Sequence, residues 1–84
     1  MPHSFRPSVV VAQAAPSGRY VFLTEADRWT ADLAEAEVIE DEAHGDIRLL
    51  EAGYSGASIS GVRLEEVRFG PRGPVGLKGA AQPA

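Results

Sequence analysis

Two short runs of strand-forming residues, with a turn between them, constrain the fold of this chain more than any other feature. Residues 9–12 are Val-Val-Val-Ala, and residues 20–24 are Tyr-Val-Phe-Leu-Thr. β-Branched and aromatic side chains favour strands, whereas the intervening Pro16-Ser17-Gly18 favours a turn. The pattern predicts an antiparallel hairpin. Because residues 20–24 carry apolar side chains on both faces, we expect this run to be the central strand of the sheet.

Short elements are predicted between this hairpin and the acidic part of the chain. Thr30 or Asp32 can cap a single helical turn over residues 33–36. Residues 37–40, Glu-Val-Ile-Glu, have the composition of a short third strand.

One longer helix is predicted over residues 41–52. Asp41 is a suitable N-cap residue, and Gly53 occupies the C′ position, where helices commonly end in left-handed backbone. Apolar residues with helical spacing form one stripe, through which we expect the helix to pack: Ala43, Ile47, Leu49 and Leu50.

A last strand is predicted over residues 59–69. Its apolar side chains before Glu65 are out of phase with those after Glu66. We therefore expect a bulge at this pair of glutamates, which would bring the apolar side chains onto one face.

These elements predict a small α+β fold in the order β-β-β-α-β, with an antiparallel sheet packed on one helix. We expect one domain at residues 8–69, since 84 residues are too few for two. Residues 1–7 are expected to be a flexible N-terminus. Residues 70–84, rich in Gly, Pro and Ala, are expected to be a disordered tail.

Acidic residues concentrate in the middle of the chain. From Asp32 to Glu51 there are eight carboxylates and a single cation, Arg48, whereas the segments before Glu25 and after Gly61 are each net positive. The acidic block is either a solvated face or a docking face for a basic protein surface. The candidate docking residues are Glu35, Glu37, Glu40, Asp41, Glu42 and Asp46.

Trp29 has two possible roles. In the core it would remove about 150–250 Å² from water and supply much of the stability of so small a domain, whereas exposed it would be an anchor for a partner. A lone tryptophan at the end of a small sheet favours the core. The residues expected to define the structural signature of the domain are Tyr20, Phe22, Trp29, Leu33 and Ala36.

No catalytic or metal-binding arrangement can be assembled from these residues. Cysteine is absent, which excludes disulfides, thiolate nucleophiles and cysteine-ligated metals. His3 and His44 are not spaced as a ligand pair, and we expect both to be surface residues. We therefore expect a protein that is not an enzyme, with no cofactor and no metal.

Charge and hydropathy also limit the partners. The acidic middle disfavours nucleic acid, whose phosphates require clustered Lys and Arg. No apolar run approaches the roughly 18 residues of a membrane span. The absence of cysteine fits a reducing compartment, so we expect a cytoplasmic protein with a protein partner.

The chain resembles a family of short alphaproteobacterial proteins of unknown function. The resemblance is carried by SVVVAQAAPSGRYVFLT, Trp29 and TADLAEAEVIEDEA, and it covers about residues 8–69. Family members typically end in a basic segment where this chain has its Gly/Pro/Ala tail, and their helix is richer in Ala and Glu than one with Gly45 and Ile47. Their genes are typically found beside those for sulfite or nitrite reductase.

The resemblance implies a non-enzymatic accessory of assimilatory sulfite or nitrite reduction. Its partner would be sulfite reductase or the electron-donor system of that enzyme, contacted through the acidic residues named above. The alternative is a small structural or regulatory protein-binding module with no link to sulfur metabolism.

Overall fold

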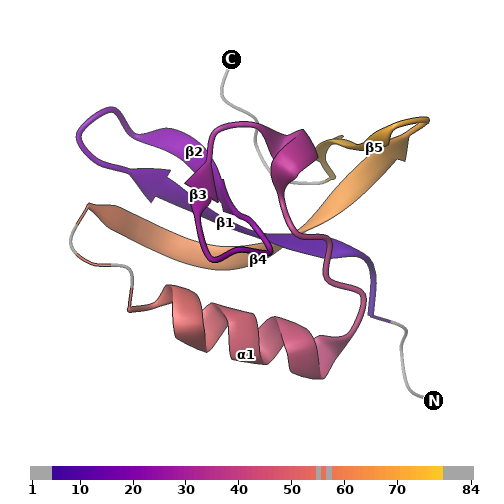
Figure 1. Cartoon of the computed structure of the whole chain (residues 1–84), viewed down its shortest axis with the longest axis horizontal. Coiled ribbons are helices and arrows are strands. Elements are labelled where there is room, and N and C mark those ends of the chain that lie inside the picture. The colour runs from indigo at the N-terminus through magenta and orange to yellow at the C-terminus, as the bar shows by residue number, and fades with distance from the viewer. Residues whose placement is uncertain (1–4, 55, 57, 79–84) are drawn as a thin grey trace.

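In the part of the chain that the structure describes, the strands form one curled antiparallel sheet, and a single α-helix lies along one side of it (Figure 1). The structure is a computed structural model that describes residues 5–54, 56 and 58–78. Its elements are β1 Ser8–Ala14, β2 Arg19–Leu23, β3 Trp29–Thr30, the 3-10 turn η1 Leu33–Glu35, α1 Glu42–Ala52, β4 Ile59–Gly70 and β5 Gly73–Leu77. The expected α+β class and the small single domain are confirmed.

The strand order is β3-β2-β1-β4-β5, so β1 is the central strand. It pairs with β2 through Val11↔Phe22 and with β4 through Val10↔Leu64. The hairpin of β1 and β2 is confirmed, but the prediction that residues 20–24 form the central strand is wrong. The Val-Val-Val run is fully buried on both faces, and only the middle of the sheet provides this environment.

Two apolar clusters occupy the two faces of the sheet. The first lies between the sheet and α1 and is formed by Val10, Leu23, Ile39 and Ala52, with Phe5, Trp29, Leu49, Val62 and Leu64 packed against them. The second lies on the opposite face and is formed by Val9, Val11, Phe22, Ala36, Val67 and Leu77, with Tyr20, Leu33 and Val38 packed against them. The apolar residues are therefore divided between two thin layers.

These two layers explain why the bulge expected at Glu65-Glu66 is absent. Leu64 packs towards α1 and Val67 packs towards the opposite face, so the change of phase in β4 serves both clusters. The pairing of β1 with β4 instead shifts near Gly61, whose φ of +65° suits glycine.

The third strand is also placed differently from the prediction. Trp29–Thr30 forms β3 by pairing with Phe22 and Leu23 of β2. Within residues 37–40, the structure forms one isolated bridge, between Ile39 and Ser8. The predicted helical turn is confirmed as η1, where the side chain of Asp32 accepts a hydrogen bond from the backbone of Ala34 at 3.0 Å.

Part of the expected disordered tail is a fifth strand. β5 pairs with β4 through Val67↔Leu77 and Gly70↔Gly73, and Pro71-Arg72 forms the turn between them. Gly73 has a φ of +121°, which a glycine tolerates after a tight turn. Residues 79–84 lie outside the described residues, as do residues 1–4 of the expected flexible N-terminus, whereas Phe5 packs against the α1-side cluster.

The five signature residues all contribute to these clusters. Phe22 and Ala36 are buried in the cluster opposite α1, and Tyr20 and Leu33 pack against it. Trp29 is half-buried and packs against the cluster beneath α1. Trp29 therefore packs against the domain while remaining partly exposed, which lies between the two roles considered for it.

Candidate functional site

Helix α1 is delimited by local contacts that the sequence predicted well at one end and less well at the other. The Asp41 carboxylate accepts a hydrogen bond from the backbone N–H of His44 at 3.0 Å, so Asp41 is the N-cap. Gly53 caps the C-terminal end, but its φ of −63° keeps it right-handed. Positive φ occurs later, at Gly56.

The face that α1 turns towards the sheet carries only Leu49 of the predicted apolar stripe. This inner face consists of Gly45, Arg48, Leu49 and Ala52, of which all but the half-buried Leu49 are buried. A Cβ added to Gly45 would lie 2.9 Å from Cδ1 of Leu64 on β4. The helix therefore approaches the sheet closely because small residues stand at the contact.

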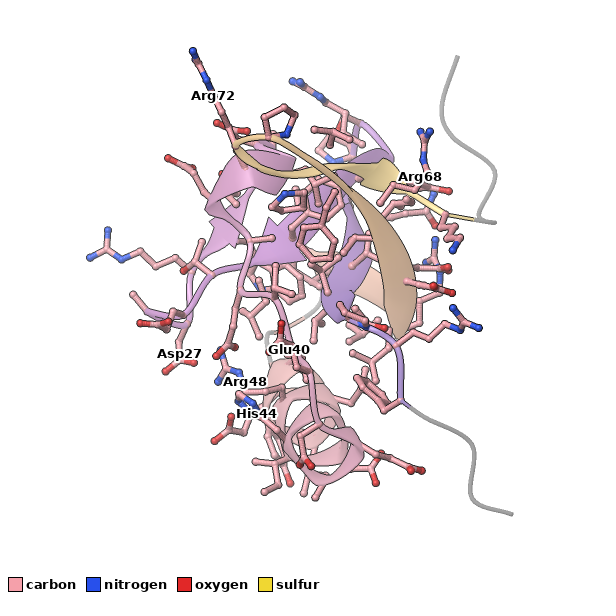
Figure 2. All side chains as sticks on the ribbon, turned by 90° about the vertical axis from the view of Figure 1, so that its right-hand side faces the viewer. Asp27, Glu40, His44, Arg48, Arg68 and Arg72 are labelled. Carbon is pink, nitrogen blue, oxygen red and sulfur yellow. The ribbon has the colours of Figure 1, made fainter. Side chains whose placement is uncertain are left out.

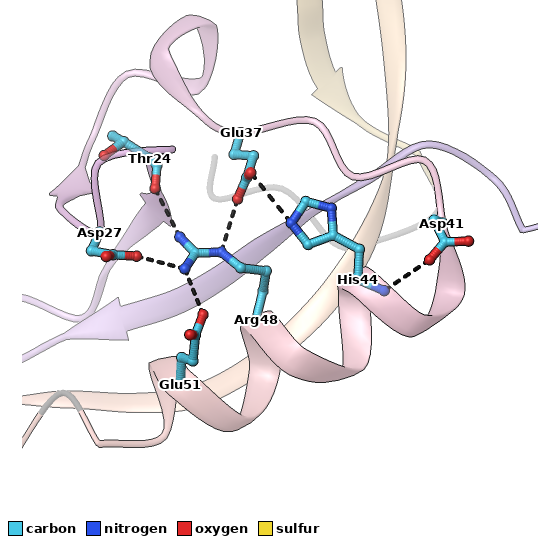
Figure 3. Close-up of polar contacts among 7 residues, drawn as sticks. All are labelled: Thr24, Asp27, Glu37, Asp41, His44, Arg48 and Glu51. Atoms are coloured by element: carbon cyan, nitrogen blue, oxygen red, sulfur yellow. Dashed lines mark hydrogen bonds and ion pairs between the residues drawn. The ribbon is translucent and has the colours of Figure 1, made fainter.

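Arg48 is the centre of an ion-pair network between α1 and the rest of the domain (Figure 3). Its Nε donates to Oε1 of Glu37 at 2.9 Å, and one terminal nitrogen donates to Oε1 of Glu51 at 2.7 Å and to Oδ1 of Asp27. The other terminal nitrogen donates to the backbone oxygen of Thr24 at 3.0 Å. One guanidinium thus joins the helix to the β2–β3 turn and to the segment before α1.

The charges of this network favour a permanently protonated arginine. Burial by itself would lower the pKa of Arg48, but the hydrogen bonds that its guanidinium donates to Asp27 and Glu51, together with the charge of Glu37, outweigh burial and raise the pKa above its usual value. The side chains of Arg48 and Glu37 are 9% and 14% exposed, so this pair is the shielded part of the network. We conclude that the network has a structural role, positioning α1.

The opposite face of α1 carries the other three residues of the predicted stripe and is exposed. A helix turns about 100° per residue, so Ala43, Ile47 and Leu50 point away from the sheet when Arg48 and Ala52 point towards it. Ile47 is 56% exposed and Leu50 is 67% exposed. Tyr54, which follows in phase just after the helix, is 81% exposed. We call these four residues, Ala43, Ile47, Leu50 and Tyr54, the outer face.

The predicted acidic residues are divided between structural and exposed positions. Glu35 accepts a hydrogen bond from the hydroxyl of Thr30 at 2.6 Å, Glu37 binds Arg48, and Asp41 caps the helix. Glu37 is half-buried, whereas the other five are exposed: Glu35, Glu40, Asp41, Glu42 and Asp46. Glu42 and Asp46 are one turn apart on one side of the outer face, and Glu51 lies on its other side. Exposed carboxylates therefore form an acidic rim on two sides of the apolar outer face, and one of them, Glu51, also binds Arg48.

The histidine on α1 lies beside the network, where Nε2 of His44 is 3.5 Å from Oε2 of Glu37 (Figure 3). Among the described residues, no group of three His, Asp or Glu side chains is arranged to hold a metal ion. Arg68 and Arg72 lie at the far end of the molecule from α1 (Figure 2). The charge segregation seen along the sequence is thus also present in space.

Sequence reasoning missed the two residues that matter most here. Arg48 is the lone cation among the eight carboxylates of residues 32–51, and this isolation is the signal that could have identified it as a partner of some of them. Tyr54 lies beyond the end of the predicted helix, although it continues the i, i+4, i+7 phase of Ile47 and Leu50.

Residues 8–79 match the family described as "Protein of unknown function (DUF2849)". The chain belongs to the DUF2849 family. The match covers the acidic segment, α1 and β5, so both ends of the sheet lie within the family's span. No curated protein and no solved structure matches the chain. Within the described part of this DUF2849 protein, no helix is long and apolar enough to cross a membrane.

Proposed function

We propose that this DUF2849 protein is a non-enzymatic accessory protein that binds a partner protein through the outer face of α1. The observation that supports this most is the exposure of Ile47, Leu50 and Tyr54 on one side of an anchored helix. Contiguous exposed apolar residues with a polar rim are typical of protein interaction sites, where tyrosine is enriched. Because the Arg48 network already holds the helix, binding would require little ordering of the chain.

The rim of the outer face indicates the chemistry of the partner. Glu42 and Asp46 on one side and Glu51 on the other are exposed carboxylates. A complementary surface has an apolar centre surrounded by Lys or Arg. A second copy of this chain would bring the same carboxylates together, and the chain has a net charge of −4, so the charges disfavour self-association.

We assign the partner to assimilatory sulfite or nitrite reduction, as sulfite reductase or its electron-donor system in the cytoplasm. The resemblance to proteins encoded beside these reductases supports this assignment, and the acidic rim is compatible with a basic patch on a redox enzyme. Contacts of this kind are steered by charge, so binding would weaken as salt shortens the Debye length towards about 8 Å at physiological ionic strength.

The test is direct binding of the full chain to purified sulfite reductase, and in parallel to its electron donor, by biolayer interferometry at low and high salt. We expect salt-sensitive binding that the double variant Ile47→Ser/Leu50→Ser weakens at least about tenfold, since buried apolar anchors dominate interfaces. Phe69→Ser is the matched control, because Phe69 is 51% exposed on β4, away from the outer face. If neither sulfite reductase nor its electron donor binds at low salt, and a deletion strain grows normally on sulfate, the assignment is wrong.

The second candidate is a protein-binding module with no link to sulfur metabolism. It is favoured by the same outer face, since apolar and carboxylate side chains specify a basic, apolar partner without specifying its pathway. Binding by another purified candidate that is equally sensitive to Ile47→Ser/Leu50→Ser, without binding to either reductase, would favour this second function.

A further inference from the structure

A second concave site lies on the face of the sheet opposite α1. It has a volume of about 380 Å³ and opens between β2, the segment leading into η1, and β5. In Figure 1, β5 curls away from α1 towards the side of the sheet that carries η1. Its walls are the described residues Arg19, Tyr20, Phe22, Ala31, Leu33, Val75, Gly76 and Leu77. We call this site the β2–β5 groove.

The floor of the β2–β5 groove is apolar, whereas polar atoms contribute a large share of its lining nearer the solvent. Phe22 and Leu77 belong to the buried cluster on this face, and Tyr20 and Leu33 pack against it. At the rim, Val75 is 60% exposed although it lines the groove. A volume of a few hundred Å³ with aromatic and aliphatic walls is the usual form of a small-molecule site.

One charged residue stands among these walls, and it is a cation. Arg19 is exposed at the start of β2, and its side chain forms no ion pair with any described residue. By contrast, the neighbouring Arg63 is held by Glu65 at 2.6 Å and lies over the ring of Tyr20, 5.4 Å from its centre. The guanidinium of Arg19 is therefore available to an anion seated in the groove.

We propose that the β2–β5 groove binds a small amphiphilic carboxylate, with its aryl or alkyl part against Phe22 and Leu77 and its carboxylate on Arg19. The apolar walls remove the hydrocarbon part from water, and the planar fork of arginine matches the two carboxylate oxygens. This site is separate from the outer face of α1, because the sheet lies between them. It does not depend on the proposed partner protein.

The probe is 4-phenylbutyrate, compared with its neutral amide, 4-phenylbutyramide, in a titration of the ¹⁵N-labelled full chain followed by NMR. The acid should perturb backbone amides of Arg19–Leu23, Leu33 and Leu77, saturably, and bind about tenfold more tightly than the amide, because a charge-assisted hydrogen bond is stronger than a neutral one. Arg19→Gln should reduce the affinity of the acid to that of the amide.

Three further variants test the location. Ala31→Trp should fill the groove and abolish binding of both compounds; if this variant does not give a folded spectrum, Arg19→Gln decides. Arg72→Gln, at an exposed arginine of the β4–β5 turn outside the groove, and Ile47→Ser/Leu50→Ser should leave both affinities unchanged. Equal affinity for acid and amide, an unaffected Arg19→Gln variant, or perturbations confined to α1 would each overturn the proposal.

Discussion

The two faces of helix α1 differ in the opposite sense from a typical amphipathic helix. The inner face carries Gly45, the ion-paired Arg48 and Ala52, with Leu49 half-buried beside them. The outer face carries Ile47, Leu50 and Tyr54, all more than half exposed. A helix is normally expected to turn its larger apolar residues towards the core.

This difference indicates separate roles for the inner and outer faces of α1. The space between α1 and the sheet is already filled by side chains from strands and loops, such as Val10, Leu23 and Ile39. The helix contributes close backbone approach, the half-buried Leu49 and one guanidinium, while Ile47 and Leu50 remain exposed. Exposed apolar residues reduce solubility unless they are covered, so their presence on an anchored helix favours a binding role.

Among the variants that test the difference between the two faces of α1, the largest loss of stability is expected when the cation of the inner face is removed. Arg48→Ala leaves the shielded Glu37 carboxylate without its arginine, with His44 at 3.5 Å as its remaining neighbour, and breaking such a pair from one side costs about 3 kcal/mol of unfolding free energy. Urea unfolding, followed by the fluorescence of Trp29, would measure the loss.

The matched control is the double variant Arg48→Met/Glu37→Met. It removes both charges, so it should recover most of the stability lost in Arg48→Ala. A cost below about 1 kcal/mol for Arg48→Ala would show that the network does not hold the helix.

The second-largest loss of stability is expected at Gly45, where the inner face of α1 approaches the sheet closely. Gly45→Leu would push into Leu64 and Phe5 and should cost about 2 kcal/mol by overpacking. Gly45→Ala is the control: the flexible end of Leu64 can move, and the helix-propensity gain of about 1 kcal/mol offsets the crowding. Thermal unfolding of both variants separates them, and equal stability would contradict the contact at 2.9 Å.

A smaller loss of stability is expected at the N-cap of α1, where both faces of the helix begin. Asp41→Ala removes the cap that satisfies the backbone N–H of His44 and should destabilise the protein by about 1 kcal/mol. Asp41→Asn retains a capping oxygen and should be nearly neutral. Circular dichroism during urea unfolding measures both changes. If Asp41→Asn lowered the free energy of unfolding as much as Asp41→Ala does, the effect would be due to the charge of Asp41, and the cap interpretation would be wrong.

The smallest effect on stability is expected at the outer face. Leu50→Ser should change the free energy of unfolding by less than about 0.5 kcal/mol, since Leu50 is 67% exposed. Its neighbour Leu49, which packs against the α1-side cluster, should cost more when changed to Ser, about 1–2 kcal/mol. Chemical denaturation of these two variants tests which side of the helix faces the sheet. A larger loss of stability in Leu50→Ser than in Leu49→Ser would place the outer face in the core.

Local rules predicted much of the fold and part of the candidate site. Strand-forming residues identified β1 and β2, and Asp41 identified the start of α1, because caps and strand preferences depend on a few neighbouring residues. Glu42 and Asp46 were correctly expected at the surface. The role of Glu37 was not predictable in this way, because its partner Arg48 is 11 residues away.

The wrong predictions for β5 and β4 share one cause. Both followed local sequence pattern, which does not show which segments of the chain pack together. β5 was expected to be disordered because of its Gly and Pro, yet Gly70, Pro71 and Gly73 form the turn that returns the chain to β4. The bulge expected at Glu65-Glu66 presumed one buried face, whereas β4 contacts a cluster on each face.

For this DUF2849 protein, the sequence by itself determined the α+β class, the bounds of α1, its N-cap and the position of an apolar stripe on the helix. The tertiary structure alone decided that β1 is central, that β5 belongs to the sheet and that the stripe faces outward. Periodicity states which side chains share a face, but it does not state which surface meets that face. That choice depends on how strands and loops distant in sequence fill the limited core of an 84-residue domain.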